Sequence, residues 1–597
     1  MPSGSKLNKD LQDERDKVSF EVSEFTNWYH GGAKKVEEKR FLENYFLSDP
    51  ELKGDVDIGY MSHKEKYEEA VRRSVIILKK IQNLKSEGYD RSDLINKTLI
   101  GPLTSAVLPE ANPFVTHFGM FIPTLINFGT PEQQAEWVER AWNIQVIGTY
   151  AQTELSHGTF VRGIQTTATY DPRTKEFVVN SPDITAYKWW PGGLGHTCNH
   201  AVVFAQLYSL GKYHGLQPFI IQLRDFETHK PMKGVTIGDI GNKVGFGSVN
   251  NGFLGFDNVR VPLKNMLMRH SKVLESGEFI KPKSAVLTYG IMTLLRVNIL
   301  EGMANLMAKA VTIVTRYSTA VVTNETVESI QVCRRACGGH GYLNSSGFHD
   351  IFGSAAAAQA YEGENTVMLL QTARFLMKAW QQAQKGGRLT PTVAYLGNFA
   401  GLKAKSDRWD SSPQGILRAL QTTAAGKIAL ASKHLQAKLK HMSPEQATNH
   451  TGIELASAAE IHCQVFLLQS SIDALGKAAQ TVSPSLGNVF NDVLELFAVD
   501  LATRYLGDIL QFVKISPGHI EQLQVRLEIA LKNLRFNAIG IVDGFDITDP
   551  QLGSTLGASD GNVYERLLEA AMRSPLNKED VNKSFHMHLK PFMKSNL

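Results

Sequence analysis

The feature that most constrains the fold of this chain is the spacing of its apolar residues, which changes near residue 150 and again near residue 280. Outside these limits, apolar residues recur at three- and four-residue steps, as in amphipathic helices. Between them, short β-branched runs such as AVVFAQL and PFIIQL alternate with glycine and turn residues, which is typical of strands. This order predicts a β-domain that follows one helical region and precedes another.

The length and a further break predict four domains. A chain of 597 residues exceeds what one hydrophobic core serves, since domains usually run to about 100–200 residues. A polar stretch near residues 403–413 separates two helical regions in the second half. The predicted domains are an N-terminal helical domain (1–149), a central flavin-binding β-domain (150–280), a shortened helical bundle domain (281–403) and a C-terminal helical domain (404–597). The fold class is mostly α with a central β-domain.

Composition and charge exclude several classes of function. With 63 basic and 59 acidic side chains and no long run of one sign, the net charge of +4 gives no electrostatic reason to expect nucleic acid. The N-terminal MPSGSKLNKDLQDERDK has no apolar centre and is too polar for a secretory signal. The most apolar long stretch is interrupted by Arg296, Glu301 and Lys309, which predicts a buried helix and no membrane insertion.

Two cofactor classes are also disfavoured. Four cysteines are too few for a disulfide framework. Cys333, Cys337 and His340 have no second ligand pair at a suitable spacing, so no metal is expected. The glycines of WWPGGLGH do not stand between a strand and a helix, as a Rossmann phosphate loop requires, so a nicotinamide cofactor is not expected either.

Four motifs in a fixed order point to one family. YAQTELSHGT, WWPGGLG, CGGHGY and YEGENTVMLLQTARFLMK are accompanied by LTYGIMTLLR and DGNVYERL. Together with the order of the domains, they resemble the acyl-CoA oxidase branch of the acyl-CoA dehydrogenase superfamily over nearly the whole chain. The resemblance implies an acyl-CoA dehydrogenase-like fold with an extra C-terminal helical domain. It also implies an FAD enzyme that oxidises fatty acyl-CoA to trans-2-enoyl-CoA and reduces O₂ to H₂O₂, the first step of peroxisomal β-oxidation.

Such chemistry needs a base, because the α-proton of a thioester is only weakly acidic and must leave as hydride departs from the β-carbon. A Glu directly before a helix is ordinarily a cap, but the resemblance places the catalytic base at Glu362. Glu364 is the nearest rival. If the helix has begun by Glu364, two residues turn it about 200° away from Glu362, so we expect Glu364 to face elsewhere.

Hydride also needs an acceptor that no side chain provides, and the resemblance names FAD. The hydroxyl and nearby amides of Thr153 can bond the polar edge of the flavin, and Gly158 permits close approach, although the same segment could be a plain polar turn and Ser156 stands where the family usually has glycine. The run Lys188–Gly192 predicts an aromatic wall and a tight turn. The expected FAD-binding residues are Tyr150, Ala151, Gln152, Thr153, Gly158, Thr159, Gly192, Gly338 and Asn365.

The expectation for Gly338 and the substrate site each have a competing interpretation. Gly338 resembles a close approach to the FAD of a neighbouring subunit, with a helix-to-loop break as the alternative. Arg296 lies in an apolar helix and needs an anionic partner, which is either a structural carboxylate or the substrate. By resemblance this helix lines the acyl-CoA side. The expected substrate-binding residues are Val286, Leu287, Thr288, Tyr289 and Arg296.

The resemblance also predicts partners and location. The C-terminal Ser595-Asn596-Leu597 resembles the small-basic-Leu address that a peroxisomal import receptor reads, with Asn in place of the basic residue. The expected partners are fatty acyl-CoA, O₂ and this receptor. The expected assembly is a homodimer, with a heterodimer with a related oxidase as the alternative.

One stretch departs from the family. After VTIVTRYS, which ends at Ser318, only TAVVTNETVESIQVCRRA precedes CGGHGY, whereas family members carry several dozen more residues. The absent stretch would include an Arg for the FAD pyrophosphate, and Val321 and Val322 stand in its place. One alternative is therefore an FAD-deficient, inactive relative that serves as a partner subunit. Another is a dehydrogenase that feeds a carrier flavoprotein, which the extra C-terminal domain disfavours.

Overall fold

The computed structural model describes residues 7–53, 58–101, 103–108, 110–158, 160–282, 302–313, 326–359, 364–399, 409–579 and 581–591. The chain divides into two compact units, which are described separately. One consists of Glu38–Tyr317, Val321–Ala358 and Ile547–Leu597, and the other of Met1–Glu37, Ser318–Ala320 and Gln359–Asp546. The four-domain division remains a prediction, because each unit joins stretches of several predicted domains.

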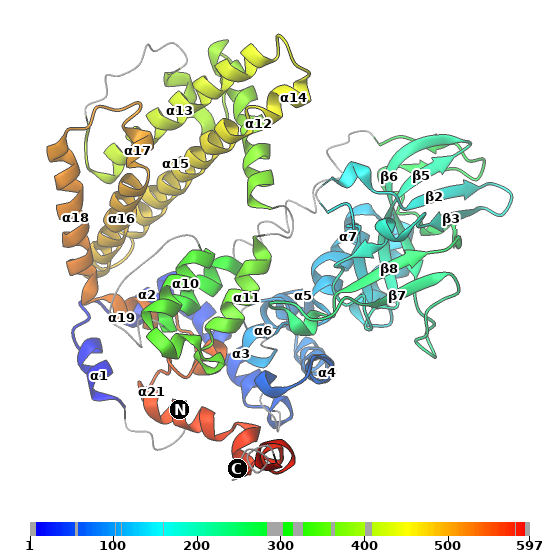
Figure 1. Cartoon of the computed structure of the whole chain (residues 1–597), viewed down its shortest axis with the longest axis horizontal. Coiled ribbons are helices and arrows are strands. Elements are labelled where there is room, and N and C mark those ends of the chain that lie inside the picture. Colours follow the sequence, from blue (N-terminus) through cyan, green and yellow to red (C-terminus); the bar gives the residue numbers. More distant parts are fainter. Residues whose placement is uncertain are drawn as a thin grey trace. The chain divides into compact units, whose positions relative to one another are not determined.

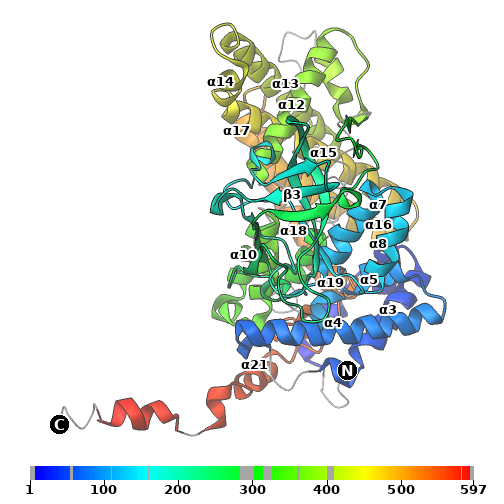
Figure 2. The same ribbon diagram turned by 90° about the vertical axis from the view of Figure 1, so that its right-hand side faces the viewer.

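The first unit begins with helices that share one core. The helix α4 starts at a capping box between Ser62 and Glu65 and buries Ile77, Ile81 and Leu84 at steps of four and three. It runs unbroken beside α5 (Figure 2). A π-helical turn at His117–Phe121 leads into α7, which packs on α8. The helices are α4 (His63–Ser86), α5 (Arg91–Thr98), α6 (Thr104–Val107), α7 (Ile122–Phe128) and α8 (Pro131–Trp142).

The β-rich stretch forms the predicted β-domain (Figure 1). Its main sheet has the order β1-β5-β2-β3-β9, with β6 paired to β5, and a smaller sheet has the order β4-β8-β7. The sequence ATYDPRTKEFVV predicts a turn at its Asp-Pro pair, and the hairpin β2–β3 turns there, directly after Asp171. The strands are β1 (Gly148–Ala151), β2 (Thr167–Asp171), β3 (Glu176–Asn180), β4 (Lys188–Trp189), β5 (His200–Ser209), β6 (Lys212–Gln222), β7 (Val235–Asp239), β8 (Gly252–Phe256), β9 (Val259–Pro262), β10 (Lys272–Val273) and β11 (Phe279–Ile280).

The strand β5 organises this domain. One of its edges is paired to β6 along its length, so β1 and β2, which both run parallel to β5, share the other edge. The chain must therefore leave the sheet after Ala151 and return at Thr167. Residues 152–166 form this excursion, and it carries most of the YAQTELSHGT motif.

The two faces of β5 are buried in different cores. Val202 and Phe204 pack with the N-terminal helices, whereas Ala201, Val203 and Ala205 pack inside the β-domain. A strand buried on both faces is expected to be a continuous apolar run without alternation, as AVVFAQL is. The strand therefore gives firm support to β1, β2 and β6, which are hydrogen-bonded along it.

A third core in the same unit is helical. It joins residues 302–313 to segments distant in the sequence, through Ile313, Phe348 and Leu556 among others. The backbone N–H of Thr555 donates to the carbonyl of Ser345 at 2.8 Å. The named helices here are α10 (Thr326–Ala336), α11 (Phe348–Ala358), α20 (Asp549–Leu552) and α21 (Val563–Met572).

The second unit is a bundle of long helices with one large apolar core (Figure 1). The sequence TVMLLQTARFLMKAW predicts an apolar stripe of Leu369, Ala373, Leu376 and Trp380 on α12. The stripe is confirmed, because the last three are buried in that core and Leu369 is packed against it. The helix α2 packs on α16, with the rings of Phe25 and Phe490 centred 6.2 Å apart. The helices are α1 (Lys9–Arg15), α2 (Val22–His30), α12 (Asn365–Gln384), α13 (Pro413–Lys438), α14 (Pro444–Asn449), α15 (Gly452–Ala478), α16 (Pro484–Arg504), α17 (Leu506–Ile509), α18 (Pro517–Arg535) and α19 (Ala538–Gly544). Among the described residues, no helix combines the length and apolar character that a membrane span requires.

Candidate active site

The excursion after β1 is held by a buried ion pair. The side chains of Glu154 and Lys188 are both 0% exposed, and the Lys188 ammonium lies 3.0 Å from Glu154 Oε1. The ammonium also donates to the carbonyls of Phe204 at 2.8 Å and Gln152 at 3.2 Å. Its three protons therefore have three acceptors, on the excursion and on β5.

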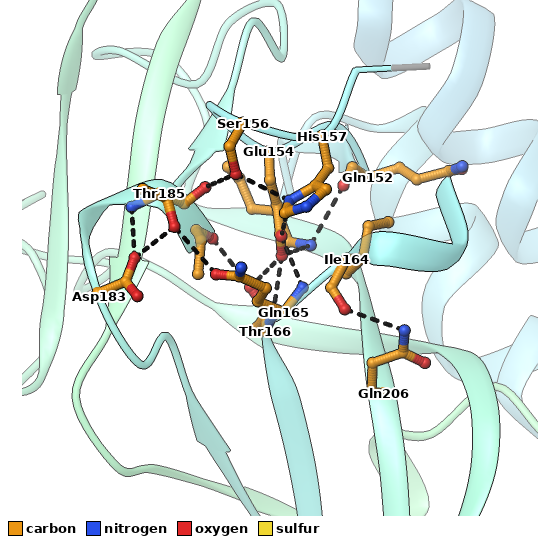
Figure 3. A network of polar contacts seen from close by, with 12 residues as sticks. Gln152, Glu154, Ser156, His157, Ile164, Gln165, Thr166, Asp183, Thr185 and Gln206 are labelled. Atoms are coloured by element: carbon orange, nitrogen blue, oxygen red, sulfur yellow. Dashed lines mark hydrogen bonds and ion pairs between the residues drawn. The ribbon is translucent and has the colours of Figure 1, made fainter. Parts of the chain in front are cut away.

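The carboxylate of Glu154 has further donors on the returning chain. It accepts hydrogen bonds from the backbone N–H of Gln165 at 2.7 Å, and from the N–H and hydroxyl of Thr166 at 2.9 and 2.6 Å (Figure 3). Burial favours the neutral form of Glu154, but the Lys188 charge and these bonds outweigh it, so the pKa of Glu154 lies below its ordinary value. Glu154 thus fastens the two ends of the excursion.

The same pair joins the two segments expected to bind FAD. Glu154 and Lys188 form an isolated antiparallel bridge, and the backbone N–H of Trp189 donates to the carbonyl of Thr153 at 2.9 Å. The segment of YAQTELSHGT is therefore fixed to the start of WWPGGLG. Sequence analysis missed this function of Lys188, although a lysine beside two tryptophans is a signal, since a buried cation needs partners.

The WWPGGLG turn is tightly built. A Cβ on Gly192 would lie 2.3 Å from Thr116 Oγ1 and 2.9 Å from Val249 Cγ1, so no larger residue fits. The hydroxyl of Thr149 donates to the Gly192 carbonyl at 2.8 Å. Trp190 has a φ of 85°, which is rare for a bulky residue, and 54% of it is exposed. Strained backbone of this kind is typical of functional sites.

The residues of these segments fit a flavin. Ala151 is fully buried at the end of β1, and the hydroxyl of Tyr150 donates to the side-chain oxygen of Gln152. Within the part of the chain that the structure describes, the hydroxyl of Thr153 has no hydrogen-bond partner and a Cβ on Gly158 would meet nothing within 4 Å. The Thr153 hydroxyl and the open space at Gly158 are thus compatible with the predicted contact to the edge of a flavin.

The start of α12 bears on one expectation. The helix begins at Asn365 and Glu364 precedes it, so the condition under which we expected Glu364 to face away from Glu362 is not met, and that orientation stays a prediction. The Glu364 carboxylate caps the helix by accepting from the N–H of Thr366 at 3.0 Å and of Val367 at 3.3 Å. The bond from the Thr366 N–H is the largest of the effects that hold the pKa of Glu364 below its ordinary value. Capping is the structural function that we had weighed for Glu362, which lies outside the described residues.

Gly338 lies where a helix ends. The helix α10 ends at Ala336, and Gly338 has a left-handed φ of 58°. A Cβ on Gly338 or Gly339 would meet nothing within 4 Å. The helix-to-loop geometry accounts for the glycine at 338, while approach to a neighbouring subunit's FAD stays a prediction.

Several residues of the predicted site and import signal lie outside the described residues: Thr159, Val286, Leu287, Thr288, Tyr289, Arg296, Glu362, Ser595, Asn596 and Leu597. So do Val321 and Val322, which stand in place of the family's Arg. Across the described part of the chain, no group of three or more His, Cys, Asp or Glu side chains is arranged to hold a metal ion. Cys333 and Cys337 are buried free thiols, and burial raises the pKa of each. A thiol of raised pKa is a poor metal ligand.

Comparison with known protein families gives three matches along the chain. The acyl-coenzyme A oxidase N-terminal family matches residues 21–147, the acyl-CoA oxidase C-alpha1 domain matches residues 319–377, and the acyl-CoA oxidase family matches residues 412–594. The chain is 43% identical to acyl-coenzyme A oxidase 1 of Drosophila melanogaster over 665 residues, covering 99% of each chain. It is 36% identical to peroxisomal acyl-coenzyme A oxidase 1 of Homo sapiens over 670 residues, covering 98% of this chain and 99% of that one.

Solved structures agree with these matches. Acyl-CoA oxidase 1 of Arabidopsis thaliana superposes with a TM-score of 0.91 at 32% identity, covering 100% of both chains. Acyl-CoA oxidase-2 of Caenorhabditis elegans, solved with FAD, ascaroside-CoA and ATP, gives a TM-score of 0.91 at 31% identity and covers 100% of this chain and 99% of that one.

The chain belongs to the acyl-CoA oxidase family. The expected fold, an acyl-CoA dehydrogenase-like structure with a further C-terminal helical domain, is confirmed. So are the class of enzyme, an oxidoreductase that acts on acyl-CoA, the cofactor FAD, and the location in the peroxisome.

Proposed function

We propose that this protein is an active homodimeric acyl-CoA oxidase in which Glu362 removes the α-proton of the fatty acyl thioester. The observation that carries this assignment is the capping geometry of Glu364. The YEGEN motif has two carboxylates, and the one at 364 holds two helix N–H groups. Glu362 is then the carboxylate of the motif that remains for catalysis.

The contacts between the YAQTELSHGT segment and the start of WWPGGLG support a placement of the flavin against these two segments. FAD, when bound, accepts the β-hydride and passes its electrons to O₂, giving H₂O₂. Thr153 and the backbone near it bind the polar edge of the ring, and Gly192 keeps the turn close to it. The backbone N–H of Glu362 polarises the thioester carbonyl, which stabilises negative charge as the α-proton leaves.

The test of this function uses the purified protein with a saturated fatty acyl-CoA. We expect a flavin absorption spectrum, and H₂O₂ formation in air without an added electron carrier. A flavin that is reduced by substrate but forms no peroxide until a carrier is added would contradict oxidase function and favour a dehydrogenase. A purified protein that binds neither FAD nor acyl-CoA would favour a partner subunit.

We also propose that the chain lacks part of the family's central bundle after Ser318. The alignment with the Drosophila relative spans 665 positions against the 597 residues of this chain, so at least 68 positions have no counterpart here. Loss of one Arg from the FAD pyrophosphate should weaken FAD by about 10- to 100-fold, because a hydrogen bond to a charged group contributes about 1.5–3 kcal/mol.

This second proposal is tested by the FAD content of the protein as purified. We expect partial occupancy, and a melting temperature that rises with added FAD. Insertion of the family's stretch between Ser318 and Glu328 should raise the FAD occupancy and strengthen the dimer together. Full occupancy in the unaltered chain would contradict the proposal and direct attention to Arg334 or Arg335 as the replacement cation.

The C-terminal tripeptide is proposed to bind the peroxisomal import receptor. Removal of Ser595-Asn596-Leu597 should move a fluorescent fusion from puncta to the cytosol without changing activity in vitro, because the receptor reads a free C-terminus. Puncta that persist would mean that import depends on a dimer partner or on another signal.

A further inference from the structure

The three contacts of Lys188 go beyond the neutralisation of one carboxylate. Glu154 already accepts three hydrogen bonds from Gln165 and Thr166. The Lys188 ammonium makes one bond to Glu154 and two to backbone carbonyls, those of Phe204 and Gln152. A buried ammonium needs three acceptors, and one of those that Lys188 uses is the Gln152 carbonyl, which belongs to the peptide bond that carries the Thr153 N–H.

We propose that Lys188 is a positioning residue for the flavin, which acts through the peptide bond between Gln152 and Thr153. The inference rests on the proposed placement of FAD against Thr153. Lys188 holds the carbonyl end of this peptide from inside the domain, and so fixes the direction and strengthens the donor character of the Thr153 N–H.

The direction follows from peptide geometry. The peptide unit is planar and trans, so its carbonyl and its N–H point in opposite directions. Because the Gln152 carbonyl points to a fully buried ammonium, the Thr153 N–H points away from that ammonium. The other end of the same residue is fixed too, since the Thr153 carbonyl accepts from the N–H of Trp189.

The strength of the donor follows from the charge. A cation at the carbonyl oxygen draws electrons from the amide and makes its N–H more acidic, and the effect is large where water is excluded. Burial lowers the pKa of Lys188 to about 8, against the opposing effect of Glu154. The side chain therefore still carries its charge at neutral pH.

Three variants separate positioning from folding. Lys188→Met leaves the Glu154 carboxylate buried without its cation. The double variant Lys188→Met with Glu154→Gln is neutral at both places. Lys80→Met serves as the matched control. Lys80 lies in the same unit and forms an ion pair of 2.7 Å with Asp49, and both side chains are at least four-fifths buried.

The measurements are the dissociation constant for FAD, the visible spectrum of bound flavin and the melting temperature without ligand. We expect the double variant to recover most of the melting temperature that Lys188→Met loses, yet to bind FAD about tenfold more weakly than the natural protein and to show a shifted flavin spectrum. Lys80→Met should lose stability with no change in spectrum.

A double variant with natural FAD affinity and spectrum would overturn the inference, since Lys188 would then act only as the counter-ion of Glu154. This outcome is distinct from failure of the proposed function. If the proposed function fails, the natural protein itself forms no peroxide, or a substitution at Thr153 or Gly192 leaves its FAD affinity and spectrum unchanged.

Discussion

Two carboxylates in motifs of the predicted site, Glu154 of the first unit and Glu364 of the second, have opposite environments, but both accept hydrogen bonds from backbone N–H groups. Glu154 is buried, paired with Lys188 and hydrogen-bonded to the returning end of the excursion from the sheet. Glu364 is exposed and caps α12. Both hold backbone in place, and the pKa of each lies below its ordinary value.

The difference between them lies in what their loss would do. A buried charge cannot be left unpaired without a large penalty, whereas water readily replaces the partner of an exposed one. A general base for thioester chemistry has a third environment, because its pKa must lie near the working pH and not far below it. The pKa of each described carboxylate is shifted away from neutral pH, in the direction opposite to what such a base requires.

The largest expected effect separates the two carboxylates of YEGEN. Glu362→Gln keeps the shape of the side chain and removes the base, so turnover should fall by about 10²–10⁴. Glu364→Gln, the matched control, should keep most of the activity because an amide oxygen can still cap the helix. The rate of peroxide formation and the affinity for acyl-CoA are measured for both variants. Near-full activity in Glu362→Gln together with its loss in Glu364→Gln would reverse the assignment.

The second effect concerns the buried carboxylate. Glu154→Gln leaves the Lys188 ammonium buried without a charged partner, which typically costs about 3–5 kcal/mol. Since the chain has two compact units, the change is best followed by hydrogen exchange at residues 150–170 together with the melting profile. A variant with the natural protection of these amides would mean that the ion pair is not needed to hold the excursion.

The sequence predicted more of the fold than of the site, for a physical reason. Periodicity located the strands and the stripe of α12, because burial along one element is a local pattern. The pairing of Lys188 with Glu154 joins residues 34 positions apart, and nothing local specifies it. The cap at Glu364 was within reach of local rules, but the start of the helix was placed two residues too early, and helix ends are the least certain feature of such patterns.

A third effect depends on pH and lies at the base of the excursion. His117 is fully buried, and burial lowers its pKa to about 4. Its Nδ1 accepts from the N–H of Gly148, the first residue of β1, and its Nε2 bonds the carbonyl of Ala141 at 3.0 Å. The folded state therefore favours neutral imidazole.

The sign of this third effect follows from linkage. Because the pKa of His117 in the folded state lies below the ordinary value of 6.5, the unfolded state binds more protons between about pH 4 and pH 6.5. The contribution of neutral His117 to the free energy of unfolding is therefore complete above about pH 6.5 and is lost as the pH falls through about 4. We expect the melting temperature to fall on acidification, and to fall less in His117→Gln. Equal slopes for the two proteins would show that His117 does not titrate with unfolding.

The smallest effect is expected at the exposed cap. Glu364→Ala removes the acceptor of two helix N–H groups and should cost about 0.5–2 kcal/mol, whereas Glu364→Ser, which keeps a capping oxygen, should cost less. Hydrogen exchange at the first turn of α12 reports the local loss, and the rate of peroxide formation reports whether the preceding Glu362 is still held in position. If Glu364→Ala lowers the rate by more than its local destabilisation explains while Glu364→Ser does not, the cap also positions the base. If the two variants show the same hydrogen-exchange rates in this turn and the same rate of peroxide formation, water caps the helix as well as the carboxylate does. In that case the exposed Glu364 can be replaced by water, unlike the buried Glu154.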